Sequence, residues 1–152
     1  MQLTLHTDFS LRTLIYVALK REGELSTVSE VAEALSISRN HLVKVVHHLG
    51  QAGFLQTVQG KNGGMMLAKP AALIGVGDVI REMEPTLQPV DCNKPSGRCR
   101  LLPSCELRHA LQEASAAFMA VLDRYTLADL VAEPASLVKL VGINITELPR
   151  AH

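Results

Sequence analysis

The feature that most limits the fold of this chain is a pair of closely spaced helix starts. Thr27 and Glu30 match the capping-box pattern, in which a hydroxyl and a carboxylate three residues later satisfy the first turn of a helix. The helix that they begin is expected to end near Leu35. Ser38 can cap a second helix over residues 39–51, whose apolar side chains share one face. Two short helices joined by a tight turn predict a helix-turn-helix.

The period of the apolar residues changes after the second helix. Residues 54–58 and 65–68 have the composition of β-strands, and residues 59–64 between them are polar and rich in Gly. This pattern, ended by Pro70, predicts a β-hairpin. A hairpin directly after a helix-turn-helix is a wing, so the expected fold class is mainly α, a winged helix-turn-helix.

Further helices are expected on both sides. Helical spacing predicts a helix over residues 7–20, with Thr7 as a possible N-cap, and a short helix over residues 76–84. A long helix from Cys105 to about Tyr125 repeats apolar residues in alternating steps of four and three, which is typical of a helix that pairs with another helix. This apolar seam consists of Leu107, Leu111, Ala114, Phe118, Val121 and Tyr125. We therefore expect a long C-terminal dimerisation helix.

These segments divide the chain into four parts. We expect a winged helix-turn-helix DNA-binding domain over residues 1–84, a cluster-binding loop that contains the cysteines over residues 85–104, and a dimerisation helix region over residues 105–133. The sequence leaves the structure of the tail, residues 134–152, open.

Charge is distributed unevenly along the chain. The sequence has 15 basic and 15 acidic residues, yet no Asp or Glu lies between Ser36 and Lys69. Local charge determines the field that a phosphate experiences, so the acid-free segment favours DNA binding over a helix-turn-helix used only for packing. Aromatic residues make up only 3% of the chain. Since proteins that bind single strands stack bases on aromatic rings, duplex DNA is the expected partner.

The second helix of a helix-turn-helix enters the major groove with its first turns. Arg39 and Asn40 have the donors and acceptors that read guanine and adenine edges, and His41 lies in the same stretch. Ser38 and Lys44 suit phosphates. The candidate contacts of the wing tip, near the minor groove, are Lys61, Asn62, Gly63 and Gly64.

The three cysteines of the chain, Cys92, Cys99 and Cys105, share one polar loop that is broken by Pro and Gly. Three sulfurs cannot all pair as disulfides, and clustered cysteines in a cytosolic protein are more often metal ligands or redox groups. Structural zinc sites usually contain closely spaced cysteine pairs, which are absent here. Soft thiolates favour iron–sulfur clusters. Such a cluster is the favoured interpretation, with zinc, redox-active thiols and structural cysteines as alternatives.

A cluster held by three thiolates needs a fourth ligand. His109 is one candidate, because residues four apart on a helix share a face and Cys105 precedes it by four. A carboxylate is the other. His47 and His48 have no cysteine near them in the sequence, so they are expected at the surface or at the edge of the core. The sequence leaves both 2Fe–2S and 4Fe–4S clusters open.

Several segments together resemble one known family. Residues 3–12, the helix start at 38–44, the wing at 60–70 and the three cysteines resemble NsrR, the nitric-oxide-sensitive repressors among the Rrf-type winged-helix regulators. The resemblance covers residues 1 to about 130. It implies a homodimeric transcriptional repressor with one iron–sulfur cluster per subunit. Such a repressor binds operator DNA and releases it when nitric oxide attacks the cluster.

The resemblance also implies roles for single residues. The three cysteines match the cluster ligands of the family, and Asp8 matches an aspartate that the partner subunit donates as fourth ligand. Arg12 matches a residue that pairs electrostatically near the cluster. The related IscR regulators of cluster assembly carry a Cys-x-x-His ending, but Arg108 occupies that position here. An iron–sulfur-status regulator similar to IscR, or a zinc-stabilised DNA-binding protein, is the alternative.

The sequence also bears on location and on enzymatic activity. Its start lacks a basic segment followed by an apolar run, and its longest apolar run, residues 116–122, is far shorter than the ~18 residues of a membrane span. We expect a cytoplasmic protein with no membrane partner. A thiol oxidoreductase would need a Cys-x-x-Cys pair or a cysteine with an activating histidine, for which His109 is weak support. No enzymatic activity is expected.

Overall fold

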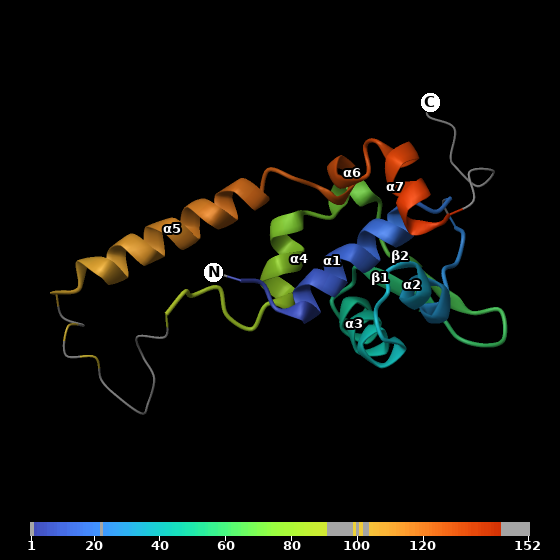
Figure 1. Cartoon of the computed structure of the whole chain (residues 1–152), viewed down its shortest axis with the longest axis horizontal. Helices are drawn as coiled ribbons and strands as arrows, with labels where there is room; N and C mark the ends of the chain where they lie inside the picture. Colours follow the sequence, from blue (N-terminus) through green and yellow to red (C-terminus); the bar gives the residue numbers. More distant parts are fainter. Residues whose placement is uncertain (1, 22, 91–98, 100, 102–103, 144–152) are drawn as a thin grey trace.

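The computed structural model describes residues 2–21, 23–90, 99, 101 and 104–143 (Figure 1). In chain order, its elements are α1 (Leu5–Ala18), α2 (Val28–Ala34), α3 (Arg39–Gln51), β1 (Leu55–Val58), β2 (Gly64–Leu67), the 3₁₀ helix η1 (Ala71–Leu73), α4 (Val76–Met83), α5 (Glu106–Leu122), α6 (Leu127–Leu130) and α7 (Pro134–Val141). The expected fold class is confirmed: a mainly helical winged helix-turn-helix with a two-stranded wing and a long C-terminal helix.

The first helix begins before the expected position. Thr4, and not Thr7, is the N-cap of α1, and its side chain accepts a hydrogen bond from the Thr7 backbone N–H. Thr7 is fully buried, and its hydroxyl donates to the Glu84 carboxylate. The sequence could not indicate this start, because Glu84 lies at the end of α4. The helix ends at Ala18 rather than at residue 20, with Leu19 as its C-cap.

The helix-turn-helix forms at the expected residues. Thr27 and Glu30 make both hydrogen bonds of the capping box. The Ser38 hydroxyl caps α3 by accepting from the His41 backbone N–H. In the turn between the two helices, Ser36 has a φ of 53°, a left-handed conformation that reverses the chain within a few residues.

The wing is attached to the helix-turn-helix at its base. The strands β1 and β2 are antiparallel, with Leu55 opposite Leu67 and Val58 opposite Gly64. Met65 of β2 also exchanges two backbone hydrogen bonds of 2.9 and 2.8 Å with Ser26, just before α2. This additional pairing fixes the direction of the hairpin relative to the helices.

The core lies where α1 contacts α3 and α4 (Figure 1). Leu14 of α1, Leu42 and Leu49 of α3 and Val79 of α4 are almost completely buried there. Because α1 touches both of the other helices, it connects the helix-turn-helix with the end of the winged domain that leads into the cysteine loop.

The helix α5 extends away from this core (Figure 1). Near its C-terminal end, Met119 packs on Val76 and Ile80 of α4. The apolar seam is largely exposed, including Leu107 (66%), Phe118 (36%), Val121 (45%) and Tyr125 (45%). An apolar stripe of this kind is available to a second helix. Among the described residues, neither α5 nor any other helix is both long and apolar enough to cross a membrane.

The tail packs back onto the winged domain. Leu127 of α6 and Val138 of α7 are buried in the same core as α1 and α3. Pro134 starts α7, and Gly142 ends it with a φ of 69°, a left-handed conformation that favours glycine. Residues 144–152 lie outside the described residues.

Candidate DNA-binding surface and cysteine loop

The first turns of α3 present the side chains that we expect at the DNA. Arg39, Asn40, His41 and Lys44 are all exposed. The Ser38 hydroxyl accepts from the His41 backbone N–H at 3.4 Å, so its own hydrogen remains for a phosphate oxygen. The opposite face of α3 is buried, which directs the polar face outward.

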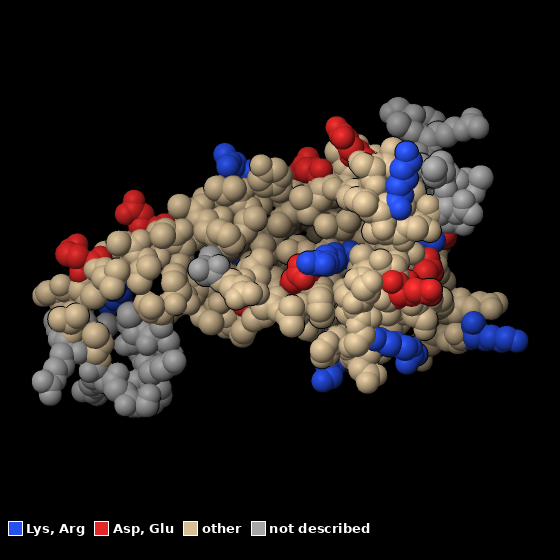
Figure 2. Space-filling model, in the orientation of Figure 1, with Lys and Arg blue, Asp and Glu red and all other residues tan. Residues whose placement is uncertain are grey.

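A groove connects the start of α3 with the wing. It is lined by Ser29 and Arg39 from the helix-turn-helix and by Gly63 and Gly64 from the hairpin. The Arg39 Nε donates to the Ser29 Oγ at 3.4 Å, so the guanidinium lies at the edge of this groove. Figure 2 shows Lys and Arg side chains, without Asp or Glu, along the edge formed by α3 and the wing tip. The structure thus brings both sets of candidate DNA contacts to one positively charged side.

The two wing glycines also have a structural role. A Cβ on Gly63 would lie 2.2 Å from the carbonyl oxygen of Val58, and one on Gly64 would lie 2.7 Å from that of Ser26. Both glycines therefore shape the hairpin itself. The exposed tip of the wing consists of residues 61–62, which carry the side chains that can reach a partner.

One carboxylate connects the start of α1 with the end of α4. Glu84 Oε2 accepts from the Thr4 backbone N–H at 3.1 Å, from the Thr4 hydroxyl at 3.2 Å and from the Thr7 hydroxyl at 2.5 Å. A carboxylate at a helix N-terminus is also favoured by the helix dipole. Because Glu84 directly follows α4, these bonds fix the segment that enters the cysteine loop relative to α1.

A histidine pair connects α1 with the recognition helix. His6 Nε2 and His48 Nδ1 lie 2.9 Å apart, and the ring centroids are separated by 5.2 Å. Burial and the adjacent His48 lower the pKa of His6, and Glu84 acts in the opposite direction. The sequence predicts His48 at the surface or at the edge of the core, but it does not indicate a partner on another helix.

Asp8 lies on an accessible face of α1. The Arg12 Nε donates to Asp8 Oδ1 at 2.9 Å, and the side chains of Asp8 and Arg12 are 37% and 55% exposed. The structure therefore places Asp8 beside Arg12, where a second protein chain can reach the carboxylate.

The described cysteines are free thiols near the start of α5. Cys99 is exposed, and Cys105 is half-buried. Cys105 is the N-cap of α5, where the helix dipole favours negative charge, and His109 is exposed one turn later. Cys92 lies outside the described residues. Two free thiols on one short stretch have the donor chemistry of a soft-metal centre. Within the described part of the chain, however, no three His, Cys, Asp or Glu side chains are close enough to hold a metal ion.

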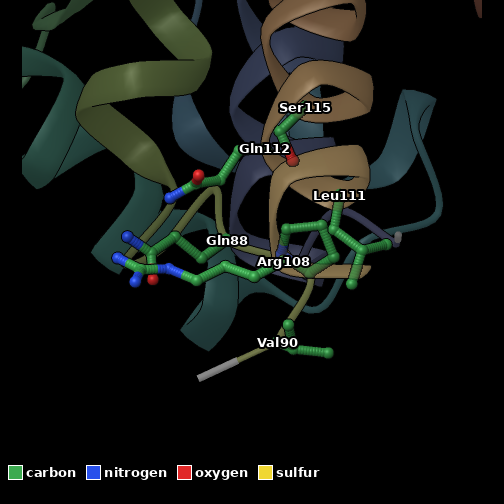
Figure 3. Close-up of a pocket in the computed structure, with 7 residues that line it drawn as sticks. Gln88, Val90, Arg108, Leu111, Gln112 and Ser115 are labelled. Carbon is green, nitrogen blue, oxygen red and sulfur yellow. The ribbon is translucent and has the colours of Figure 1, made fainter. Parts of the chain in front are cut away.

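The first part of the cysteine loop and the N-terminal half of α5 line one small pocket (Figure 3). Its lining consists of Gln88, Pro89, Val90, Arg108, Leu111, Gln112 and Ser115. Figure 3 shows the Arg108 side chain extending toward Gln88. The residue that replaces the histidine of the Cys-x-x-His pattern therefore lies beside residues 88–90 of the cysteine loop.

One family model and several solved structures of transcriptional regulators match this chain. The Rrf2 family model, described as an iron-dependent transcriptional regulator, matches residues 3–133. CymR, the global cysteine regulator of B. subtilis, is 25% identical with a TM-score of 0.63, over 87% of this chain and 97% of CymR. The oxidized form of Staphylococcus aureus CymR is 26% identical with a TM-score of 0.68, over 86% and 95%. T. potens IscR has a TM-score of 0.70 over 90% of each chain, but at 20% identity this likeness shows the fold alone.

Proposed function

The chain belongs to the Rrf2 family of DNA-binding transcriptional regulators, and from this premise we propose that it is a nitric-oxide-sensing repressor. It binds a palindromic operator as a homodimer while each subunit holds an intact iron–sulfur cluster, either 2Fe–2S or 4Fe–4S. It releases the operator when nitric oxide reaches the cluster.

The observation that carries this proposal is the position of the free thiols. Cys105 is the N-cap of α5, the helix with the exposed apolar seam, and the exposed Cys99 precedes it in the same loop. At the other end of the loop, Glu84 is hydrogen-bonded to the first turn of α1. A group bound by this loop would therefore act between the winged domain and the helix that pairs the subunits.

The proposed ligands are Cys92, Cys99 and Cys105, with Asp8 of the partner subunit as the fourth. A bound cluster would supply the iron atoms to which nitric oxide binds. The exposed Asp8 carboxylate suits a ligand donated to another chain, and Arg12 would hold it in orientation. Loss of these ligand bonds would separate the first helix of one subunit from the loop of the other.

The proposed DNA contacts follow from the exposed face of α3 and the wing. Arg39 and Asn40 would read base edges, whereas Ser38 and Lys44 would contact phosphates. Lys61 at the wing tip would approach the minor groove. In a homodimer the two recognition helices would face two successive half-sites of the operator.

The test compares three states of the anaerobically purified protein: metal-free, cluster-loaded, and cluster-loaded after addition of nitric oxide. Visible absorbance, iron and sulfide content, and affinity for a duplex obtained by selection are measured together. Tight DNA binding is expected only in the loaded state, with at least a tenfold loss after nitric oxide. Equal affinity in all three states would exclude the proposal.

Single substitutions test the ligands. Cys99→Ala should abolish stable cluster binding, and a normal iron and sulfide content would contradict this. Asp8→Ala should retain some cluster with an altered spectrum and greater lability. His109→Ala is the matched control, because it removes the alternative ligand. A changed spectrum in His109→Ala, with an unchanged one in Asp8→Ala, would assign the fourth ligand to His109.

A second candidate function is thiol sensing without iron. It is favoured by the exposed thiol of Cys99 and by the similarity to CymR, which has been solved in an oxidized form. A thiol sensor would be colourless, and its DNA affinity would change with oxidant and recover with reductant. The iron analysis of the preceding experiment distinguishes the two functions.

A further inference from the structure

A cross-helix ion pair connects the winged domain with α5. The Arg81 Nη2 of α4 donates to Asp123 Oδ2 at 2.5 Å, and Asp123 is the C-cap of α5. The Arg81 Nη1 also contacts Asp78 Oδ1 at 3.3 Å within α4. The hydrogen bond from Arg81 lowers the pKa of Asp123, which keeps the carboxylate charged.

The same carboxylate fits against a glycine. A Cβ on Gly77 would lie 1.9 Å from Asp123 Oδ1, so no larger residue fits without moving Asp123. Gly77 is the second residue of α4 and is buried. The absence of a side chain at Gly77 leaves room for the Asp123 carboxylate at the C-terminal end of α5.

Backbone hydrogen bonds complete the attachment. The Val76 N–H donates to the Tyr125 carbonyl at 2.9 Å, and the Leu127 N–H donates to the Ile74 carbonyl at 2.8 Å. Met119 packs on the apolar side of α4. We refer to these contacts of residues 74–81 with residues 119–127 as the α4–α5 joint.

The α4–α5 joint lies at the C-terminal end of α5, so a small rotation there displaces the other end of this long helix. With 17 residues, α5 is about 25 Å long, and it extends away from the winged domain beyond the joint (Figure 1). A rotation of about 10° at the joint would therefore displace the far end of α5 by about 4 Å. This displacement is of the same size as the rise of one base pair, about 3.4 Å.

We propose that Arg81 and Asp123 are positioning residues that set the half-site spacing of the DNA recognised by this protein. The proposal rests on the proposed pairing of two subunits through α5. In such a dimer the angle between α5 and the winged domain determines the distance between the two recognition helices. The joint fixes this angle, because the Asp123 carboxylate contacts both Arg81 and Gly77 while backbone hydrogen bonds of Val76 and Leu127 hold the chain that follows α5.

The exposed Arg81–Asp123 ion pair should affect the angle between α5 and the winged domain more than the free energy of unfolding. The Arg81 and Asp123 side chains are 44% and 41% exposed, and ion pairs of that exposure add little to folding stability. Substitutions in the joint should therefore leave a folded protein that still binds one half-site. These substitutions should instead change how strongly the affinity depends on the number of base pairs between the two half-sites.

The experiment starts from a randomised duplex library, from which the cluster-loaded wild type selects its preferred sequence and spacing. Duplexes with the spacer shortened or lengthened by one and two base pairs, and a duplex with one half-site, are then titrated. The variants are Asp123→Asn, Arg81→Lys and Gly77→Ala. Asp78→Asn is the matched control, because Asp78 contacts the same guanidinium but does not cross the joint.

For the wild type and Asp78→Asn, a change of one base pair in the spacer should lower affinity at least tenfold. In the three joint variants this penalty should fall to threefold or less, or the optimum should shift, while affinity for one half-site stays within twofold. A wild-type spacing profile in Asp123→Asn and Gly77→Ala overturns the proposal and leaves the dimeric repressor intact. Selection of isolated half-sites by the wild type instead overturns the proposed dimer, and the joint proposal with it.

Discussion

His6 and His48 share a hydrogen bond of 2.9 Å that joins the first turn of α1 to the last turn of the recognition helix. His6→Ala would leave a ring nitrogen of the half-buried His48 without this partner. The free energy of unfolding of the metal-free protein should fall by about 1 kcal/mol in urea denaturation. His47→Ala, on the exposed neighbour, should change it by less than about 0.5 kcal/mol.

The same contact can be isolated by a double-mutant cycle. Since His6→Ala and His48→Ala remove one shared bond, their effects on unfolding should not add in the double variant. Strict additivity would mean that the two rings stabilise the protein independently, and that the helices are held by other contacts.

Removal of the Glu84 carboxylate should loosen the start of α1. Glu84→Ala leaves the buried hydroxyl of Thr7 and the backbone N–H of Thr4 without their acceptor. A loss of about 1–3 kcal/mol in the free energy of unfolding is expected, because the acceptor is charged. Glu82→Ala is the control on the exposed face of α4. If both variants unfold at the same urea concentration, Glu84 does not fix the first turn.

The stability of the helix-turn-helix should depend on acid pH through Glu30. Burial acts to raise the pKa of Glu30, but hydrogen bonds from Lys20, Tyr16 and the Thr27 backbone lower it below its usual 4.5. A carboxylate with a lowered folded pKa stabilises the fold above the unfolded value. This contribution is lost as the pH falls through the folded value.

Thermal unfolding from about pH 6 to about pH 3 measures this dependence. The melting temperature of the wild type should fall more steeply with acid than that of Glu30→Gln. Glu33→Gln removes an exposed carboxylate from the same helix and should keep the wild-type slope. If the melting temperature of Glu30→Gln falls with pH as steeply as that of the wild type, Glu30 is not the titrating group.

Two substitutions on α3 should have different effects on DNA binding. Lys44→Ala should weaken all duplexes alike and reduce the salt dependence by about one unit of slope, as expected for a phosphate contact. Arg39→Ala should cost about 1–3 kcal/mol and relax the preference at one base position. The two effects are distinguished by titrating each variant, at several salt concentrations, with the selected duplex and with duplexes in which one base pair is changed. A Lys44→Ala loss confined to one base position would contradict its assignment.

Much of the fold could be predicted because the residues that define its helices and its wing lie close together in the sequence. The capping box of Thr27 and Glu30 and the Ser38 cap are formed by residues three apart, so their hydrogen bonds can be recognised in the sequence. The same holds for the Gly-rich turn of the wing. The candidate DNA contacts lie at one helix start and one hairpin tip, so their exposure also followed from local pattern. Among the cluster ligands, the cysteines follow from thiolate chemistry and Asp8 from a resemblance, and all of them stay a prediction.

What the sequence could not indicate are contacts between distant elements. The sequence indicates Thr7 as a possible N-cap of α1, whereas the structure has Thr4, because the Glu84 carboxylate that binds Thr4 and Thr7 lies at the end of another helix. The structure of the tail does not follow from its own sequence, because Val138 is buried by packing on helices that lie far earlier in the chain. The contact of Gly77 with the Asp123 carboxylate likewise joins two helices that lie far apart in the sequence.

The sequence alone determined the helix-turn-helix, the wing and the long helix that follows the cysteines, because hydrogen bonds and apolar periodicity within a few residues decide these elements. The tertiary structure decided how these elements are held together, through the His6–His48 bond, the Glu84 acceptor and the contact of Gly77 with Asp123. Such contacts depend on the relative placement of whole helices, which the packing of the complete core fixes and no short stretch of sequence encodes.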